Sequence, residues 1–310
     1  MKIIVFNDTR KECHHGCSRV MNSIDVNLKG CFSSIQYIAI LEKWKLKESL
    51  KREIIQSDLV LINGEGTIHG DAPHVTELLD VLTFAHNYGV RVGVINATIE
   101  SISAANIKKL KLANFLYVRD VNTYEYLLKN NIHSMVCHDL VFYLTGDIKN
   151  LVNNNKFALT DGYGYDFEQI KLPEGFDRVT IFNRNEAYFN SSRIRKLKLM
   201  FTNFRKLKTK SAETHIDFLD LLNSYSYIVT GRYHVVCLCI FLGIPFSYTE
   251  SNTRKITNLL EDIGLVVEKF KFIDFHTPIH FTDEEKLLIN LFLKKTQIEI
   301  NEMFLYIKNN

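Results

Sequence analysis

Short runs of uninterrupted apolar residues, separated by stretches with helical periodicity, constrain the fold of this chain more than any other feature. Residues 58–63, with the sequence DLVLIN, form one such run and lead into a glycine-rich loop. The segment 73–88 then carries apolar residues at roughly helical spacing, and Pro73 suits the first turn of a helix. Strands that are apolar on both faces and alternate with helices indicate a parallel, doubly wound α/β sheet.

The same alternation continues along the chain. In the first half we expect strands at 2–7, 58–63, 90–95, 114–118 and 133–137, and helices that begin at residue 19 or cover 73–88, 104–112 and 124–129. In the second half we expect strands at 178–182, 227–229 and 245–248, and helices at 191–208, 216–222, 234–242, 253–263 and 283–307. The pattern therefore predicts two successive Rossmann-like halves.

A change of composition after residue 144 predicts where the two halves meet. Residues 146–155 are polar and rich in asparagine, as expected of a linker or a first crossing between domains. The 310 residues also exceed the ~250–300 at which a single core stops growing. We expect Rossmann-like domains at 1–150 and 151–310 that face a central cleft, in a GT-B-like architecture, with the C-terminal helix packed back on the N-terminal domain.

Charge and composition exclude several classes of protein. A net charge of +3 is too small for a nucleic-acid-binding surface. No run approaches the ~18 apolar residues that a membrane span needs, and the N-terminus reaches charged residues too soon for a signal peptide. The six cysteines are too few for a disulfide scaffold. We therefore expect a cytoplasmic protein.

The loops after the strands are where chemistry is expected, because ligands of open α/β sheets lie beyond the carboxyl ends of the strands. The loop after the second predicted strand places Glu65 between Gly64 and Gly66, followed by His69 and Asp71. Glycine lets a backbone approach a ligand closely, and a carboxylate there can act as acid, base or nucleophile. The alternative is a tight turn with a solvated glutamate.

A Gly-Arg-Tyr-His sequence at 231–234 carries the second candidate site. Arg232 opens a helix whose first N–H groups favour an anion, and its guanidinium offers a fork to a carboxylate or phosphate. His234 can transfer a proton or donate a hydrogen bond to a leaving group. The alternative is an arginine that caps a neighbouring group and a histidine that lines the core.

Two acidic residues follow neighbouring strands. Arg119-Asp120 comes after the strand 114–118, and we interpret it as a structural ion pair or a helix cap. Asp139 ends the next strand, which should point at the cleft. Its role stays open between catalysis and structure.

The loop after the first strand is crowded with histidine and cysteine. Cys13, His14, His15 and Cys17 are of metal-ligand type, but structural zinc sites use two separated pairs. We therefore predict no metal and expect the loop to lie near a bound anion. Its residues expected near substrate are Asn7, His14, His15 and Gly16.

Two basic segments offer further contacts. Thr253 is expected to cap a helix whose start, with Arg254 and Lys255, binds phosphate, and a solvated basic turn is the equal alternative. Residues 193–210 would suit a membrane surface that carries a lipid-linked acceptor, and an exposed helix face is the simpler interpretation.

The order of these motifs resembles the polysaccharide pyruvyl transferase family. The resemblance spans roughly residues 1–265 and rests on the loop 64–66, Arg119-Asp120, Asp139, Arg232-Tyr233-His234 and Gly243-Ile244-Pro245. It implies a GT-B-type fold in which Arg232 and His234 bind the carboxylate and phosphate of phosphoenolpyruvate and His234 donates a proton. The implied product is a pyruvate ketal on a glycan sugar, formed without a cofactor.

Other features look more like a branch related to retaining β-Kdo glycosyltransferases. These are the Asn-Gly-Glu-Gly loop, Leu140 directly after Asp139, and the His-His-Gly-Cys run at 14–17. This second resemblance implies transfer of a CMP-activated ulosonic acid, with Asp139 as nucleophile and Glu65 assisting proton transfer. Arg232 and His234 would then hold the charged groups of that donor.

The sequence thus predicts a transferase of capsule or lipopolysaccharide biosynthesis, with pyruvyl transfer as the first hypothesis and Kdo-type transfer as the second. A non-catalytic glycan- or nucleotide-binding protein is the third. The expected partners are a glycan or lipid-linked oligosaccharide acceptor and a phosphorylated donor, at the inner face of the cytoplasmic membrane. The predicted catalytic residues are Glu65, Asp139 and His234, and the predicted donor-binding residues are Arg232, His234, Ser251 and Lys255.

Overall fold

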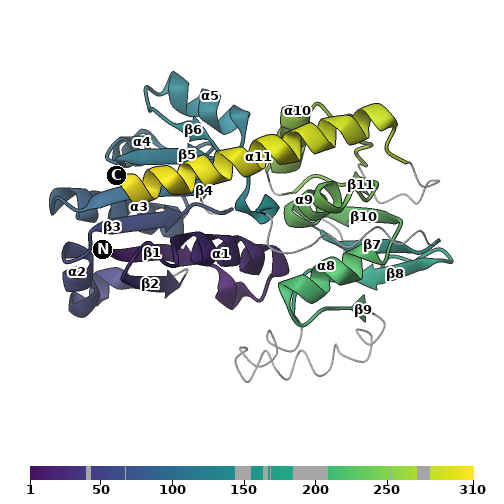
Figure 1. Ribbon diagram of the computed structural model, residues 1–310, viewed down its shortest axis with the longest axis horizontal. Helices are drawn as coiled ribbons and strands as arrows, with labels where there is room; N and C mark the ends of the chain where they lie inside the picture. Colours follow the sequence, from purple (N-terminus) through teal and green to yellow (C-terminus); the bar gives the residue numbers. More distant parts are fainter. Residues whose placement is uncertain are drawn as a thin grey trace. The chain divides into compact units, whose positions relative to one another are not determined.

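The computed structural model divides the chain into two compact units (Figure 1). It describes residues 1–39, 43–66, 68–143, 155–162, 167, 169–183, 209–251, 253–270 and 280–310. The first unit contains Met1–Lys11, Val20–Tyr143 and Thr296–Asn310, and the second contains Glu12–Arg19 and Leu144–Lys295. Two helices, α1 (His15–Leu28) and α11 (Asp283–Asn309), contribute residues to both units. Among the helices that the structure describes, none is both long and apolar enough to cross a lipid bilayer.

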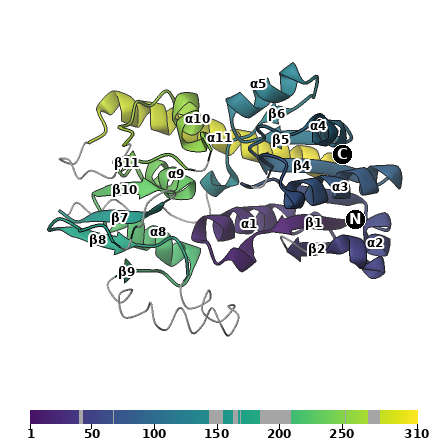
Figure 2. The same ribbon diagram turned by 180° about the vertical axis from the view of Figure 1, so that it is seen from behind.

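A parallel sheet forms the centre of the first unit (Figure 1 and Figure 2). Its described strands, in spatial order, are β2 (Ser34–Ala39), β1 (Lys2–Asp8), β3 (Leu59–Asn63), β4 (Arg91–Ala97), β5 (Phe115–Val118) and β6 (Met135–Val136). Neighbouring strands pair in parallel throughout. Its further helices are α2 (Glu48–Ile55), α3 (Pro73–Asn87), α4 (Ala104–Leu110) and α5 (Val121–Lys129). The loops after these strands therefore gather along one edge of the sheet.

The apolar runs of the sequence become the core of this unit. Every residue of β3 is buried, and Val60 and Ile62 pack in one cluster with Leu79 and Leu82 of α3. Polar side chains mark where helices begin, because the first N–H groups of a helix need acceptors. Asp120, for example, accepts a hydrogen bond from the Thr123 N–H at the start of α5. The predicted cap is therefore confirmed.

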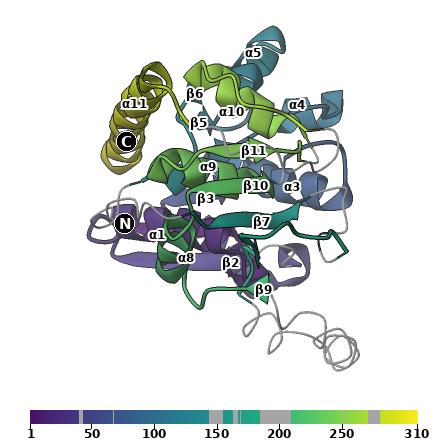
Figure 3. The same cartoon turned by 90° about the vertical axis from the view of Figure 1, so that its right-hand side faces the viewer.

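The second unit has a parallel sheet of its own (Figure 3). Its described strands, in spatial order, are β11 (Phe246–Tyr248), β10 (Tyr227–Gly231), β7 (Phe157–Gly162), β8 (Phe176–Val179) and β9 (Thr209–Lys210), with helices α8 (His215–Asn223), α9 (Tyr233–Leu242) and α10 (Lys255–Ile263). Every residue of α9 is buried, as its nearly continuous apolar sequence predicts. Gly243 (φ 67°) and Gly264 (φ 81°) end α9 and α10 in the left-handed conformation that favours glycine.

The predicted alternation is confirmed in both units, but some described strands and helices were not predicted. These are β2, α2 and β7, and the two-residue strand β9 is a fourth. The sequence of β7, FALTDG, has only three buried residues and follows directly on the asparagine-rich segment. Its apolar run is too short to stand out, although β7 lies between β10 and β8 in the sheet.

Two local predictions are wrong. Residues 15–18 belong to α1 instead of a loop. The helix α10 begins at Lys255 with Arg254 at its N-cap position, so Thr253 does not cap it. The predicted helix at 191–208 and nearly all of the expected linker at 146–155 lie outside the described residues.

Candidate functional site

The segment that leads into α1 is attached to the second unit by backbone pairing. The His15 N–H donates to the Ile181 carbonyl at 3.0 Å, and the Asn183 N–H donates to the Cys13 carbonyl at 2.8 Å. Cys13 adopts a positive φ of 58°, which turns the chain before the helix. Because buried backbone groups need partners, this pairing fixes His14 and the start of α1 beside the segment after β8.

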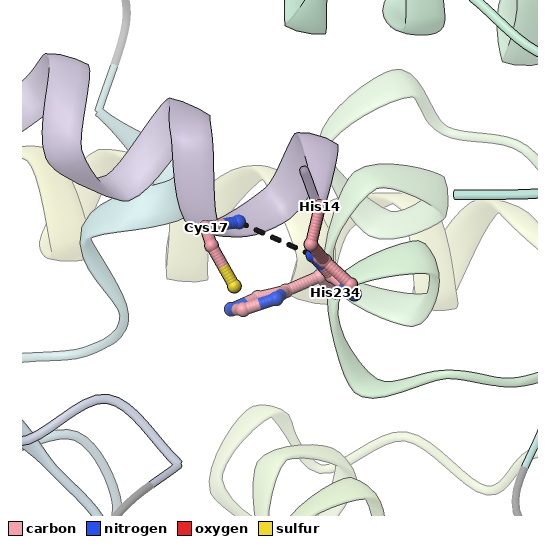
Figure 4. Close-up of side chains that lie close together, drawn as sticks. All are labelled: His14, Cys17 and His234. Carbon is pink, nitrogen blue, oxygen red and sulfur yellow. Dashed lines mark hydrogen bonds between the residues drawn. The ribbon is translucent and has the colours of Figure 1, made fainter. Parts of the chain in front are cut away.

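Two imidazole rings meet at the start of α1 (Figure 4). The ring centroids of His14 and His234 lie 5.3 Å apart, and Phe182 packs edge-on against His14 at 5.1 Å. A Cβ at position 16 would lie only 2.4 Å from the Cβ and Cγ of His234. Gly16, which the sequence analysis expected near substrate, therefore has a clear packing role: it leaves the space that His234 fills.

Arg232 occupies the N-cap position of α9 and is oriented from one side. Its Nε and Nη2 lie 2.7 and 2.6 Å from Asp161 Oδ2. Its Cζ lies 5.1 Å from the centroid of the Phe182 ring, within cation–π distance. The side chain is still 27% exposed. Asp161, at the carboxyl end of β7, and Phe182 thus hold a guanidinium that solvent can reach.

Positive charge gathers around His14. Burial is the main reason that the pKa of His14 lies well below its ordinary value of 6.5, and neighbouring groups, among them the cationic side chains of Arg232 and Lys255, lower it further. Like charges repel a further proton, and for the same reason they attract an anion. The region at the starts of α1 and α9 therefore favours a negatively charged ligand.

The His15 side chain packs against neighbouring residues of the second unit. Its Nε2 lies 3.2 Å from the Ala212 carbonyl oxygen, and its ring stacks on Phe218 at 4.9 Å. Burial lowers the pKa of His15 to about 4. These contacts account for the ring without any ligand.

The start of α10, expected to bind phosphate, contains a carboxylate. Glu250 Oε1 accepts hydrogen bonds from the N–H groups of Ser251 (3.0 Å) and Ile256 (3.3 Å). Its Oε2 accepts from the Thr257 N–H at 3.4 Å. Glu250 thus takes the place expected for phosphate, while Lys255 extends over the ring of Tyr233 with its Nζ 5.9 Å from the centroid.

In the first unit, Glu65 is enclosed by hydrogen-bonding neighbours. It is only 5% exposed. Thr9 Oγ1 donates to Glu65 Oε2 at 3.0 Å, and Asn63 Nδ2 lies 3.4 Å from the same oxygen. Asn7 Nδ2 donates to the Asn63 carbonyl at 2.6 Å and so joins the carboxyl ends of β1 and β3. The glutamate is therefore a buried, oriented carboxylate and not a solvated one.

Gly64 and Gly66, on either side of Glu65, suit their positions for two different reasons. Gly66 has a φ of 58°, a conformation that L side chains rarely adopt. A Cβ on Gly64 would lie 2.5 Å from the Cβ of Ala97 in β4. The close backbone approach that Gly64 permits is thus to the neighbouring strand β4.

Asp139 forms a buried ion pair. Its Oδ2 lies 2.8 Å from Arg119 Nη1, and the two side chains are 0% and 1% exposed. Its Oδ1 accepts a hydrogen bond from the Val141 N–H at 2.8 Å. Arg119 also donates to Thr98 Oγ1 at 2.7 Å, and that hydroxyl donates to Asp120 at 2.9 Å. Arg119 is thus ion-paired as predicted, but with Asp139.

The predicted site residues fall into two sets. The second unit contains His14, His15, Gly16, Arg232, His234, Ser251 and Lys255, and the first contains Asn7, Gly64, Glu65, Gly66 and Asp139. Sequence reasoning overlooked Asp161 and Phe182 and gave Cys17 no role. The only signal for Asp161 is an acidic residue after the short apolar run at 157–160.

Solved structures share this fold at low sequence identity. The UDP-GlcNAc 2-epimerase of Methanocaldococcus jannaschii, solved with UDP-GlcNAc and UDP, is 12% identical over 99% of this chain and 100% of that one, with a TM-score of 0.52. MnaA of S. aureus, solved with UDP, is 13% identical over 96% and 90%, with a TM-score of 0.50. A putative UDP-N-acetylglucosamine 2-epimerase of Listeria monocytogenes is 12% identical over 98% and 90%, also at 0.50. The predicted fold class, α/β with Rossmann-like units of GT-B type, is confirmed.

Sequence comparison supplies the family. No curated protein matches the chain. The family model for polysaccharide pyruvyl transferase matches residues 10–250, well over half of the chain, and includes the His14, Arg232 and His234 cluster. The protein is therefore a transferase that belongs to the polysaccharide pyruvyl transferase family.

Proposed function

We propose that this protein transfers a pyruvyl group from phosphoenolpyruvate to a sugar of a cell-surface glycan. The observation that carries the proposal is the guanidinium of Arg232, which Asp161 and Phe182 hold in place while 27% of the side chain stays exposed. Phosphoenolpyruvate is a small molecule with both a carboxylate and a phosphate. A guanidinium that solvent can reach binds such a dianionic ligand more strongly than a neutral one.

Arg232 is the residue proposed to hold the donor. Asp161 engages its Nε and Nη2 and fixes the plane of the guanidinium. A guanidinium has five N–H donors, so the fork can contact a carboxylate or phosphate while Asp161 stays in place. Arg232 also stands at the N-cap position of α9, where the helix dipole favours an anion.

His234 is proposed to move the proton. Ketal formation joins two sugar oxygens to C2 of the donor, turns its methylene carbon into a methyl group and releases phosphate. Of the two hydroxyl protons that the sugar loses, one ends on the methyl group and the other on the phosphate. An imidazole can deliver the first of these, and His234 lies in the first turn of α9 just after Arg232.

The acceptor is proposed to be a hydroxyl pair on a glycan or lipid-linked oligosaccharide. Asp139 is poorly suited to attack an anomeric carbon, because Arg119 and the Val141 N–H engage its two oxygens. This favours pyruvyl transfer over the transfer of a CMP-activated ulosonic acid. The proposed chemistry needs no cofactor.

Donor binding tests the proposal. Phosphoenolpyruvate at about 100 times its Kd should add about 2.7 kcal/mol to the free energy of unfolding, seen as a rise in Tm. Arg232→Met should abolish the rise. Arg254→Met should keep it, because Arg254 is an exposed arginine that pairs with Glu261.

Turnover completes the test. Phosphate release that requires both phosphoenolpyruvate and a glycan acceptor would establish transfer. Donor binding without any acceptor-dependent release would identify a binding protein. Stabilisation by CMP but not by phosphoenolpyruvate would overturn the proposal in favour of ulosonic acid transfer.

A further inference from the structure

We propose that His14, Cys17 and His234 form a binding site for a transition-metal ion such as Zn²⁺. One ligand atom from each side chain can be chosen so that all three lie within 4.8 Å of one another. Figure 4 shows the side chains converging, two from the start of α1 and one from the start of α9. All three residues belong to the second unit, so the cluster is internal to that unit.

The start of α1 fixes two of the ligands. His14 directly precedes the helix and Cys17 lies in its first turn. The Cys17 N–H donates to His14 Nδ1 at 3.3 Å. This contact occupies the Nδ1 lone pair and holds the ring against Cys17, and a metal that binds Nδ1 would take that lone pair in place of the long 3.3 Å contact.

The third ligand reaches the cluster because of Gly16. A Cβ at this position would lie 2.4 Å from His234, so only glycine leaves room for that imidazole. Phe182 packs edge-on against His14 at 5.1 Å and restricts its ring. The three ligand residues are only 6–9% exposed. A metal would therefore bind side chains that packing already holds in place.

The charges around the cluster decide which ions suit it. Arg232 and Lys255 bring positive charge to His14 and oppose a cation. Metal binding removes the thiol proton of Cys17 and so adds a negative charge directly beside the ion. The carboxylate of Asp161, which pairs with Arg232, offsets part of the positive charge that opposes a cation. A thiolate with two imidazoles selects Zn²⁺ or Co²⁺ over Mg²⁺ and Ca²⁺, which prefer oxygen ligands.

Metal binding has a consequence for catalysis that rests on the proposed function. Three protein ligands leave a coordination position open, as in zinc sites that accept a further ligand. A His234 nitrogen that binds the metal cannot deliver a proton from the same atom. The metal would therefore inhibit pyruvyl transfer, whereas the site itself does not depend on that reaction.

Cobalt binding tests the site without any measurement of turnover. Thiolate-bound Co²⁺ absorbs in the near ultraviolet through charge transfer. The metal-free full-length protein should gain this band on titration with Co²⁺ and lose it when Zn²⁺ is added. Cys17→Ser should abolish the band, and Cys31→Ser, which removes a partly buried thiol of the first unit, should leave it unchanged. Absence of the band in the wild-type protein, or its persistence in Cys17→Ser, would overturn the proposal.

Gly16→Ala supplies a second variant that keeps all three ligands. Its methyl group displaces His234, so Co²⁺ affinity should fall at least about tenfold, in the range seen when the support of metal ligands is disturbed. Circular dichroism checks that the variant is folded. Unchanged affinity in the folded variant would exclude His234 from the site. Because the rise in Tm with phosphoenolpyruvate is measured without metal, either proposal can fail while the other stands.

Discussion

In the first unit, Asp139 and Arg119 lie 2.8 Å apart and are almost completely buried. In the second unit, Asp161 and Arg232 lie 2.6 Å apart, yet 27% of the Arg232 side chain is exposed. Each pair lies at or just after the carboxyl ends of parallel strands, so position in the fold does not distinguish them. Solvent exposure does. Loss of either partner of a fully buried pair leaves an uncompensated buried charge and destabilises the fold, whereas an arginine held from one side can still receive an anion.

The largest expected effect concerns the buried pair. Asp139→Asn should lower the free energy of unfolding by about 3–5 kcal/mol, because Arg119 would be left as a buried charge without its counter-ion. Urea denaturation measures the change. Glu48→Gln, which breaks the exposed pair with Lys51, is the control and should hardly alter the midpoint. Unchanged stability together with lost turnover would instead make Asp139 a catalytic residue.

Acid should destabilise the second unit through His15. Its pKa is lowered from 6.5 to about 4, so the unfolded chain binds a proton there more readily than the folded one. The stability is complete above pH 6.5 and decreases as the pH falls toward 4, by roughly 3 kcal/mol at about 1.4 kcal/mol per pKa unit.

His15→Phe isolates this contribution. Phenylalanine keeps the stacking on Phe218 but cannot take up a proton. Its free energy of unfolding should decline less between pH 6.5 and 4 than that of the wild type. Parallel pH profiles for the two proteins would refute the assignment.

Arg232 should depend on Asp161 for its orientation. Asp161→Asn keeps the size of the side chain but weakens the contacts at 2.6 and 2.7 Å. We expect kcat/KM for phosphoenolpyruvate to fall about tenfold, or about 1.4 kcal/mol, mainly through KM. The matched control is Asp177→Asn, which breaks a more exposed pair with Lys210. An equal loss in both variants would argue against a positioning role.

The smallest expected effect concerns the carboxylate of the glycine loop. Thr9→Val removes the hydroxyl that donates to Glu65 and should cost about 1 kcal/mol of stability. In a double-mutant cycle with Glu65→Gln, the two effects should be non-additive, because the side chains share this bond. Full additivity in thermal or urea unfolding would show that the hydrogen bond contributes nothing.

Local sequence was sufficient where a feature depends on residues that are close along the chain. The expected strand at 58–63 appears as Leu59–Asn63 and the expected helix at 73–88 as Pro73–Asn87, because periodicity directly reflects which faces are buried. The cap at Asp120 and the glycine that ends α10 are equally local. The short strand β7 shows the limit: three buried residues give no period to detect, and only pairing with β10 and β8 makes them a strand.

The amino-acid order of this protein thus specifies its α/β class, most of its strands and helices, and the family motifs around Arg232. Tertiary packing decides which side chains meet. Asp161 orients Arg232 only because β7 and β10 pair in parallel. Cys17 joins His14 and His234 only because the start of α1 packs beside α9. The local spacing of histidine and cysteine predicted no metal, since the third ligand comes from a distant part of the chain and no local pattern encodes that contact.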